Sequence, residues 1–219
     1  MSHRKVGALL ATGLIVVGGV LFGLYISLFL QSEPTPNVIA PASAREANLK
    51  LQTVAQIGHG PTPDWVSYYS MHDGHWMHST ILHVPAHALI HVTVYEYDGQ
   101  SGLRNPLWGQ PRGIVGGVMD VNGKPLRVLN PALTAHTFSI PSLGVSVPLE
   151  GVGDNAPHQC AVAPCSLATA HNTITFSFRT GKPGEYQWQC FVPCAAGTIY
   201  GFGGPMQTIG YMDGELDVA

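Results

Sequence analysis

The chain has 219 residues, enough for one or two domains, with a net charge of −3 and only 11 % charged residues. Charge this sparse gives no basic patch, so we expect no nucleic-acid partner. Glycine and proline are abundant, at 26 and 17 residues, and separate short runs rich in Val, Thr, Tyr and Phe. This mixture favours an all-β sandwich with many turns over a predominantly helical protein.

The N-terminus predicts a membrane anchor. Residues 6–30 are apolar and uncharged, and about 20 such residues suffice to cross the hydrocarbon core of a bilayer. Arg4 and Lys5 precede this run, so residues 1–5 are expected to stay in the cytoplasm. We therefore expect a single-pass protein of the cell membrane whose C-terminal domain lies in the periplasm or outside the cell.

A cleaved signal peptide is the competing interpretation of the same segment, with Ala42-Ser43-Ala44 as its processing site. The apolar run is longer than a usual signal-peptide core, and the small residues lie well beyond its end. An uncleaved anchor fits better. Either interpretation places the domain outside the cytoplasm, where disulfides are permitted.

The rest of the chain divides into a connecting segment and one domain. Residues 31–57 are expected to form a tether and a membrane-proximal segment; within it, 45–57 fits either a short helix or a first strand. Residues 58–219 form the predicted extracytoplasmic domain. A turn-rich insertion occupies about 99–131, with Asn122-Gly123 as a hairpin turn between strands at 117–121 and 124–129.

Two groups of histidines lie in the first half of this domain. His72, His75 and His78 recur every three residues, but Asp73-Gly74 favours a turn over a helix. An irregular polar loop is the favoured interpretation, and a second metal site stays open. A further group recurs every four residues in 79–98, where a proline and a β-branched run favour strands, so we expect strand histidines rather than ligands. This group is His83, His87 and His91.

Strands are predicted where apolar residues alternate with polar ones. The clearest is 172–179, in which Ile174, Phe176 and Phe178 share one face. Others are expected at 79–98, with a bend at Pro85, and within 133–148, where His136 lies at the start of a strand.

The most informative stretch runs from residue 184 to 218. A strand leads into Cys190 and Cys194, and a glycine-rich loop follows. A last strand is expected over 211–218, and Met212 lies at its start. Two thiols and a thioether on a loop between strands are soft ligands on a rigid frame. These soft ligands predict a copper site.

These segments resemble subunit II of the haem–copper oxidases, the family of cytochrome c oxidase subunit II. AHTFSIPSLGV at 135–145 is similar to the segment that carries the family's first histidine ligand. GKPGEYQWQC at 181–190 is similar to the approach to its first cysteine. CFVPC at 190–194 matches its cysteine pair, and MDGELDV at 212–218 its methionine and last strand. The resemblance is strong over residues 133–219.

The resemblance implies a cupredoxin-like Greek-key sandwich on one transmembrane helix. It also implies a binuclear copper centre, in which Cys190 and Cys194 bridge the ions, His136 caps one of them, and the Val192 carbonyl and Met212 are weak ligands. The implied function is electron relay from a periplasmic or extracellular donor to an oxidase catalytic subunit. Oxygen reduction would belong to that partner, because this chain shows no catalytic constellation of its own.

One element of the family pattern is missing. The second histidine ligand should lie four residues after the second cysteine or three before the methionine, where this chain has Thr198 and Ile209. Three outcomes stay open: replacement by another histidine, a mononuclear site of His136, one cysteine and a methionine (Met212 or Met206), or loss of copper. The candidate replacements are His158, His171, His75 and His78. The alternative function is a copper-free, degenerate cupredoxin that serves a membrane complex as an accessory or assembly subunit.

Cys160 and Cys165 complete the cysteine inventory. Four cysteines allow three full pairings. Pairing Cys160 with Cys165 closes a small loop and leaves Cys190 and Cys194 together at the metal position, so we expect that disulfide.

Overall fold

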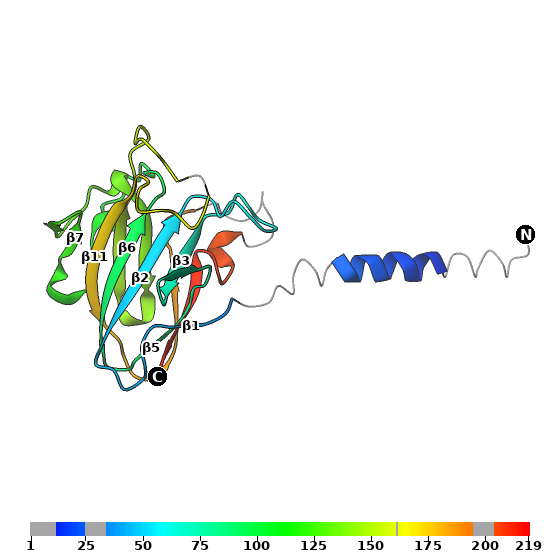
Figure 1. Ribbon diagram of the computed structural model, residues 1–219, viewed down its shortest axis with the longest axis horizontal. Helices are drawn as coiled ribbons and strands as arrows, with labels where there is room; N and C mark the ends of the chain where they lie inside the picture. The colour runs from blue at the N-terminus through cyan, green and yellow to red at the C-terminus, as the bar shows by residue number, and fades with distance from the viewer. Residues whose placement is uncertain (1–11, 25–33, 161, 195–203) are drawn as a thin grey trace, which may run out of the picture. The chain divides into compact units, whose positions relative to one another are not determined.

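The computed structural model describes residues 12–24, 34–160, 162–194 and 204–219 (Figure 1). The chain divides into two units, residues 1–33 and 34–219, which are described separately. In the first, residues 12–24 form an α-helix. No helix among the described residues is both long and apolar enough to span a bilayer. The expected anchor, 6–30, extends beyond the described residues at both ends, so it stays a prediction.

The second unit is a sandwich of two β-sheets, which confirms the expected mostly β architecture. One sheet has the order β1-β5-β13-β12-β9-β10 and the other β4-β3-β2-β6-β11-β7-β8. The first sheet consists of β1 (Asn37–Val38), β5 (Ile81–Val84), β13 (Asp213–Val218), β12 (Gly184–Gln189), β9 (Thr134–Ile140) and β10 (Val145–Glu150). The second consists of β4 (His75–Met77), β3 (Ser67–His72), β2 (Glu46–Val54), β6 (Leu89–Glu96), β11 (Asn172–Arg179), β7 (Met119–Val121) and β8 (Lys124–Leu126).

The core lies between the two sheets. Alternation places Ile174, Phe176 and Phe178 of β11 in it, as the sequence predicts. Phe138 of β9 packs at ring-centroid distances of 5.5 Å from Phe176 and 5.1 Å from Trp188 of β12. Aromatic pairs at this distance add to the free energy of burial. The sheet that carries the cysteine loop is thereby fixed against the sheet opposite.

Several local expectations are settled by the structure. Residues 46–54 form strand β2, which pairs with β3 and β6, so the helical alternative for this segment is wrong. Asp73-Gly74 forms the turn between β3 and β4, and both residues have positive φ. Asn122-Gly123 likewise turns between β7 and β8. The strand before this second turn starts only at Met119, because Gly116 and Gly117 also have positive φ.

The last strand also starts later than predicted, at Asp213 instead of residue 211. Tyr211 is held in a turn, where its amide donates a hydrogen bond to the Thr208 carbonyl. Short 3-10 helices complete the described connections: η1 (Pro106–Gly109), η2 (Val115–Gly117), η3 (Pro131–Leu133), η4 (Pro141–Leu143) and η5 (Pro205–Gln207).

Candidate metal site

His136 is held inside the sandwich by strand β9. Every residue of β9 is buried, and 2 % of the surface of His136 is exposed. The next residue, Thr137, extends the frame, since its backbone amide donates to Cys190 Sγ at 3.4 Å and its hydroxyl oxygen accepts from the amide of Phe191 at 2.9 Å. The strand thus fixes both the imidazole and the start of the cysteine loop.

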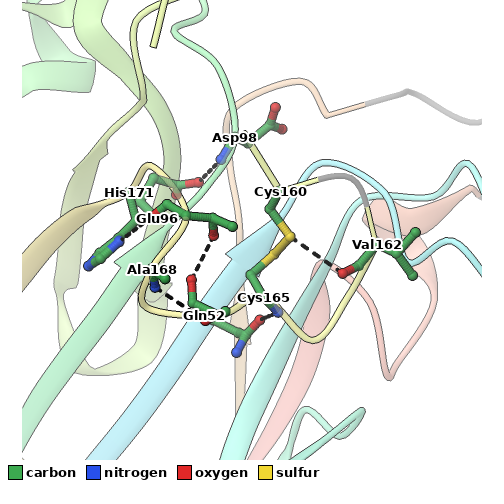
Figure 2. Close-up of a disulfide and its surroundings, with 10 residues drawn as sticks. Gln52, Glu96, Asp98, Cys160, Val162, Cys165, Ala168 and His171 are labelled. Atoms are coloured by element: carbon green, nitrogen blue, oxygen red, sulfur yellow. Dashed lines mark hydrogen bonds between the residues drawn. A yellow bond between two sulfur atoms is a disulfide. The ribbon is translucent and has the colours of Figure 1, made fainter. Parts of the chain in front are cut away.

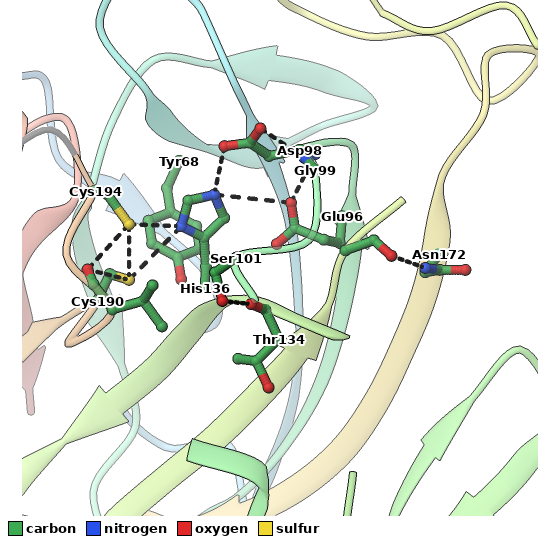
Figure 3. Close-up of polar contacts among 12 residues, drawn as sticks. Tyr68, Glu96, Asp98, Gly99, Ser101, Thr134, His136, Asn172, Cys190 and Cys194 are labelled. Carbon is green, nitrogen blue, oxygen red and sulfur yellow. Dashed lines mark hydrogen bonds and ion pairs between the residues drawn. The ribbon is translucent and has the colours of Figure 1, made fainter. Parts of the chain in front are cut away.

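Cys190 and Cys194 follow strand β12 and meet His136 (Figure 3). Cys194 Sγ lies 2.9 Å from His136 Nδ1, Cys190 Sγ lies 3.7 Å from the same nitrogen, and the two sulfur atoms are 3.5 Å apart. Both thiols are free and buried. The three ligand atoms lie within 4.8 Å of one another, so one imidazole and two sulfurs can surround a metal ion.

The backbone of the loop adds an oxygen to this group. The Val192 carbonyl oxygen lies 3.1 Å from Cys194 Sγ and 3.6 Å from Cys190 Sγ. Met212 is fully buried and its carbonyl accepts the amide of Cys190 at 3.0 Å, which ties the loop to the start of β13. Val192 thus turns its carbonyl toward the sulfurs, while the role of Met212 as a thioether ligand stays a prediction.

Two carboxylates lie on the side of the imidazole away from the sulfurs, and neither was predicted as part of the site. Asp98 Oδ2 lies 2.9 Å from His136 Nε2, and Glu96 Oε1 lies 4.0 Å from the same nitrogen (Figure 3). Glu96 occupies an inward position of β6, in line with Ile90, Val92 and Val94. A glutamate on the apolar face of a predicted strand was the available signal. Asp98 lies in a bend after the strand, and its sequence position gave no signal of a role in the site.

The two carboxylates differ in charge. Burial raises the pKa of Glu96 to about 8, partly offset by the nearby His136, so this side chain is largely protonated at neutral pH. Its Oε1 accepts the amide of Asp98, while Oε2 has no hydrogen-bond partner among the described residues. Burial also acts to raise the pKa of Asp98, but the hydrogen bond and charge of His136 outweigh it and lower that pKa. Asp98 is therefore the ionised partner of the imidazole.

The pKa values of the two thiols are shifted in opposite directions. Burial opposes ionisation of Cys190, but hydrogen bonds from Cys194 and His136 outweigh it and hold its pKa well below the ordinary value. The hydrogen bond to Cys190, together with burial, raises the pKa of Cys194. The thiolate is the form that binds metals, and these contacts favour that form at Cys190.

The site opens to solvent on one side, through a hollow of about 300 Å³. Its lining includes the buried residues His136, Val192 and Cys194 and the exposed residues Ala55, Asp64 and Ser101. Cys194 retains 8 % of its surface, whereas Cys190 retains none. The Cys194 side of the group is therefore the accessible one.

The histidines considered as replacements for the missing ligand have other neighbours. His171 Nδ1 lies 2.8 Å from the carbonyl oxygen of its neighbour Thr169, and its ring packs on Tyr97. His78 stacks on Tyr69, and its Nε2 lies 2.8 Å from Ser67 Oγ. Among the described residues, His136 is the histidine that the metal-ligand group contains. The structure brings none of His75, His78, His158 and His171 into that group.

Of the two positions where the resemblance would place the second histidine, Thr198 lies outside the described residues. Ile209 is exposed and pairs with Asp213 in an isolated β-bridge. Met206 is half-buried, and its carbonyl accepts a hydrogen bond from the Gln189 side chain. The mononuclear alternative that uses the Met206 sulfur as a ligand therefore stays a prediction.

The expected disulfide between Cys160 and Cys165 is present (Figure 2). The Cys165 amide donates to Gln52 Oε1 of β2 at 2.6 Å, so the loop is attached to the sandwich. The bridge belongs to a second, smaller hydrophobic cluster that includes Val54, Tyr97 and Tyr211. It is separate from the two free thiols, which confirms the expected division of the four cysteines.

Comparison with known proteins yields only distant likenesses. No protein-family model matches the chain, and no curated protein matches it either. Among solved structures, the copper protein rusticyanin is 12 % identical, with 89 % of this chain and 92 % of that chain covered at a TM-score of 0.35. Rusticyanin from Thiobacillus ferrooxidans, in another structure, gives the same identity and coverage at a TM-score of 0.28. A chain from a haem–copper terminal oxidase dimer is 13 % identical, with both chains fully covered at a TM-score of 0.30. Likenesses at these scores do not assign a family.

Proposed function

We propose that residues 34–219 form a cupredoxin-type domain that binds copper through His136, Cys190 and Cys194 and relays electrons. The observation that carries the proposal is the burial of one imidazole and two thiols with all three ligand atoms within 4.8 Å. Thiolate and imidazole are the ligands that proteins use for copper in electron transfer. The donor set of this site therefore fits the metal that the sequence resemblance implies.

Bound copper would supply one-electron redox chemistry. The chain contributes a nearly fixed geometry, because β9 holds His136 and the β12–β13 pair holds the cysteine loop at both ends. The Asp98 carboxylate orients the imidazole from behind, as outer partners of metal-bound histidines do. A site that changes little between oxidation states lowers the cost of moving an electron.

We further propose that the domain serves as the subunit II-like electron-relay component of a respiratory haem–copper oxidase. The support is the sequence resemblance over residues 133–219, whose histidine and cysteine segments converge in the fold. In this proposal a single-pass anchor at residues 6–30 holds the domain at the membrane, outside the cytoplasm. The Cys160–Cys165 disulfide supports that compartment, because such bonds persist under oxidising conditions. An oxidase catalytic subunit and an electron donor outside the cytoplasm are the proposed partners.

Copper reconstitution of the full-length chain tests the central part. Loaded with Cu(II) in detergent, it should develop an intense visible thiolate-to-copper band, and metal analysis should find copper retained after dialysis. Cys190→Ser should abolish the band. Cys160→Ser is the matched control, because it also removes one sulfur but lies in the disulfide, and it should keep the colour.

Two results would contradict the proposal. The first is a colourless chain that takes up no copper although its two thiols are free, which would support the copper-free accessory or assembly subunit instead. The second is preferential retention of zinc, since two cysteines and one histidine also suit that metal, which has no redox chemistry.

A further inference from the structure

The ligand group at His136 contains one nitrogen donor. The described residues give it one imidazole and two sulfurs, together with the Val192 carbonyl. The adjoining residues 195–203 read AAGTIYGFG and contain no His, Cys, Met, Asp or Glu. Wherever that segment lies, its side chains offer only the hydroxyl groups of Thr198 and Tyr200. Neither the ligand group nor this segment offers a second imidazole, so any further nitrogen donor would come from elsewhere.

The hollow beside the group lies where such a donor could approach. His136, Val192 and Cys194 all line it, so a molecule inside it meets the ligands directly. Its volume of about 300 Å³ is far above the roughly 10–15 Å³ that one water molecule needs, which leaves room for a small ring. Cys190 is completely buried, so the approach is from the Cys194 side.

The carboxylates that line the hollow affect which ligands it can bind. Asp98 lines it with 29 % of its side chain exposed, and the exposed Asp64 lies at the same hollow. Two carboxylates in one open cavity repel anions. The charge distribution therefore favours a neutral ligand over an anionic one.

We propose that the hollow is a ligand site, in which a small neutral nitrogen donor binds directly to the metal held by His136, Cys190 and Cys194. The donor takes the coordination position that the missing histidine leaves. This inference rests on the proposed function and adds to it an exchangeable ligand, in the way that catalytic metal sites keep one position open while structural sites are closed.

Imidazole is the probe, and the copper-loaded full-length chain is the sample. Titration with imidazole should shift the visible band and the electron paramagnetic resonance spectrum in one saturable step. Azide, an anion of similar size, should bind about tenfold more weakly or not at all. Asp64→Asn removes one carboxylate from the hollow and should reduce the difference in affinity between imidazole and azide.

A substitution at the rim locates the binding. Ala55 is exposed and lines the hollow without belonging to the ligand group. Ala55→Trp should weaken imidazole binding by about tenfold while copper content and the band without imidazole stay unchanged. Ala42→Trp is the matched control, because Ala42 is exposed and does not line the hollow; it should bind imidazole as the parent chain does.

The possible results of these experiments distinguish a failure of this inference from a failure of the proposed copper binding. A chain that takes up no copper overturns both. A copper-loaded chain whose spectra ignore imidazole overturns this inference alone. A response that appears only after Tyr200→Phe also overturns it, since the phenol would then occupy the position. Equal imidazole binding by Ala55→Trp and Ala42→Trp would also overturn it, because imidazole would then not bind in the hollow.

Discussion

His136 is framed by groups of different charge on its two sides. On one side its Nδ1 meets the two sulfurs, and on the other its Nε2 meets Asp98 at 2.9 Å. Glu96 lies further away at 4.0 Å, and its pKa of about 8, raised by burial, keeps it mostly neutral. One ionised carboxylate therefore sets the ring's orientation and leaves Nδ1 facing the metal position.

Asp98→Asn should weaken copper binding by roughly 10- to 100-fold, the usual effect of removing the outer partner of a metal-bound histidine. The amide keeps the size of the side chain but loses the charge that holds the imidazole. A competition titration against a copper chelator measures the affinity. Asp64→Asn removes a charge from the same hollow without touching His136 and should change the affinity little. Equal losses in the two variants would mean that the effect is one of general electrostatics.

His78 gives the fold a separate dependence on pH. Burial, with a smaller effect from His59, lowers the pKa of His78 from 6.5 to about 4. The unfolded chain therefore takes up this proton at a higher pH than the folded chain does. The stability that His78 contributes is complete above pH 6.5 and is lost as the pH falls toward 4. Because His78 is only half-buried, solvent screens part of this effect, and we expect a loss on the order of 1–2 kcal/mol.

Urea unfolding at pH 7 and pH 4.5 checks this sign. His78→Asn should reduce the difference in unfolding free energy between the two pH values. His87→Asn serves as the control, since His87 is exposed, and asparagine tolerates its positive φ of 50°. A pH difference that is the same in both variants would contradict the assignment to His78.

At the scale of elements, the β12–β13 hairpin carries the cysteine loop and depends on one glycine. Gly214 of β13 is opposite Trp188 of β12, whose indole Nε1 donates to the Thr80 carbonyl at 2.8 Å. A Cβ at Gly214 would lie 2.4 Å from Trp188 Nε1 and 2.5 Å from Thr80 O. A side chain there would have to displace the indole or the backbone.

Gly214→Ala should therefore destabilise the domain by about 2–3 kcal/mol through overpacking and the strained indole hydrogen bond. Chemical denaturation followed by tryptophan fluorescence measures the change. Gly153→Ala is the control, because nothing lies within 4 Å of a Cβ at that position. A Gly214→Ala variant as stable as the control would show that the hairpin accommodates the methyl group.

A strand was easier to predict from sequence when only one of its two faces is buried. Strand β11 shows its alternation in NTITFSFR because its polar face is only half-buried, and its bounds were predicted correctly. Strand β9 is buried on both faces, since Thr137 and Ser139 find partners within the fold. The alternation of Phe138 and Ile140 with Thr137 and Ser139 is therefore a weaker signal, and the strand was predicted only within the wider range 133–148.

The convergence of His136, Cys190 and Cys194 was predictable, but the surroundings of these residues were not. The two cysteines were proposed as ligands from their place on a loop between strands, and His136 from the family resemblance. Asp98 lies 38 residues before His136 and reaches it only because β6 and β9 belong to facing sheets. No local pattern encodes such a contact. Glu96 was visible as a charged residue on an apolar face, and its meaning appears only once the sandwich is closed.

At the scale of the whole domain, the Cys160–Cys165 disulfide and the cluster around it stabilise the end of the sandwich next to the site. Cys160→Ser should lower the free energy of unfolding by roughly 2 kcal/mol, the value for a very short closed loop. Cys160 is the milder position to change, because Cys165 is buried. Thermal unfolding under non-reducing conditions measures it, and reductant should bring the parent chain to the same midpoint. If the parent chain and Cys160→Ser had equal unfolding midpoints without reductant, the disulfide would have no stabilising role.

The central claim is that copper held by His136, Cys190 and Cys194 carries one electron reversibly. Spectroelectrochemistry of the copper-loaded, full-length chain tests it most directly. The account predicts a thiolate-to-copper band that bleaches on one-electron reduction, returns on reoxidation, and is absent from Cys190→Ser. A copper-loaded chain whose band does not respond to the applied potential, or whose reduction releases the metal, would contradict it.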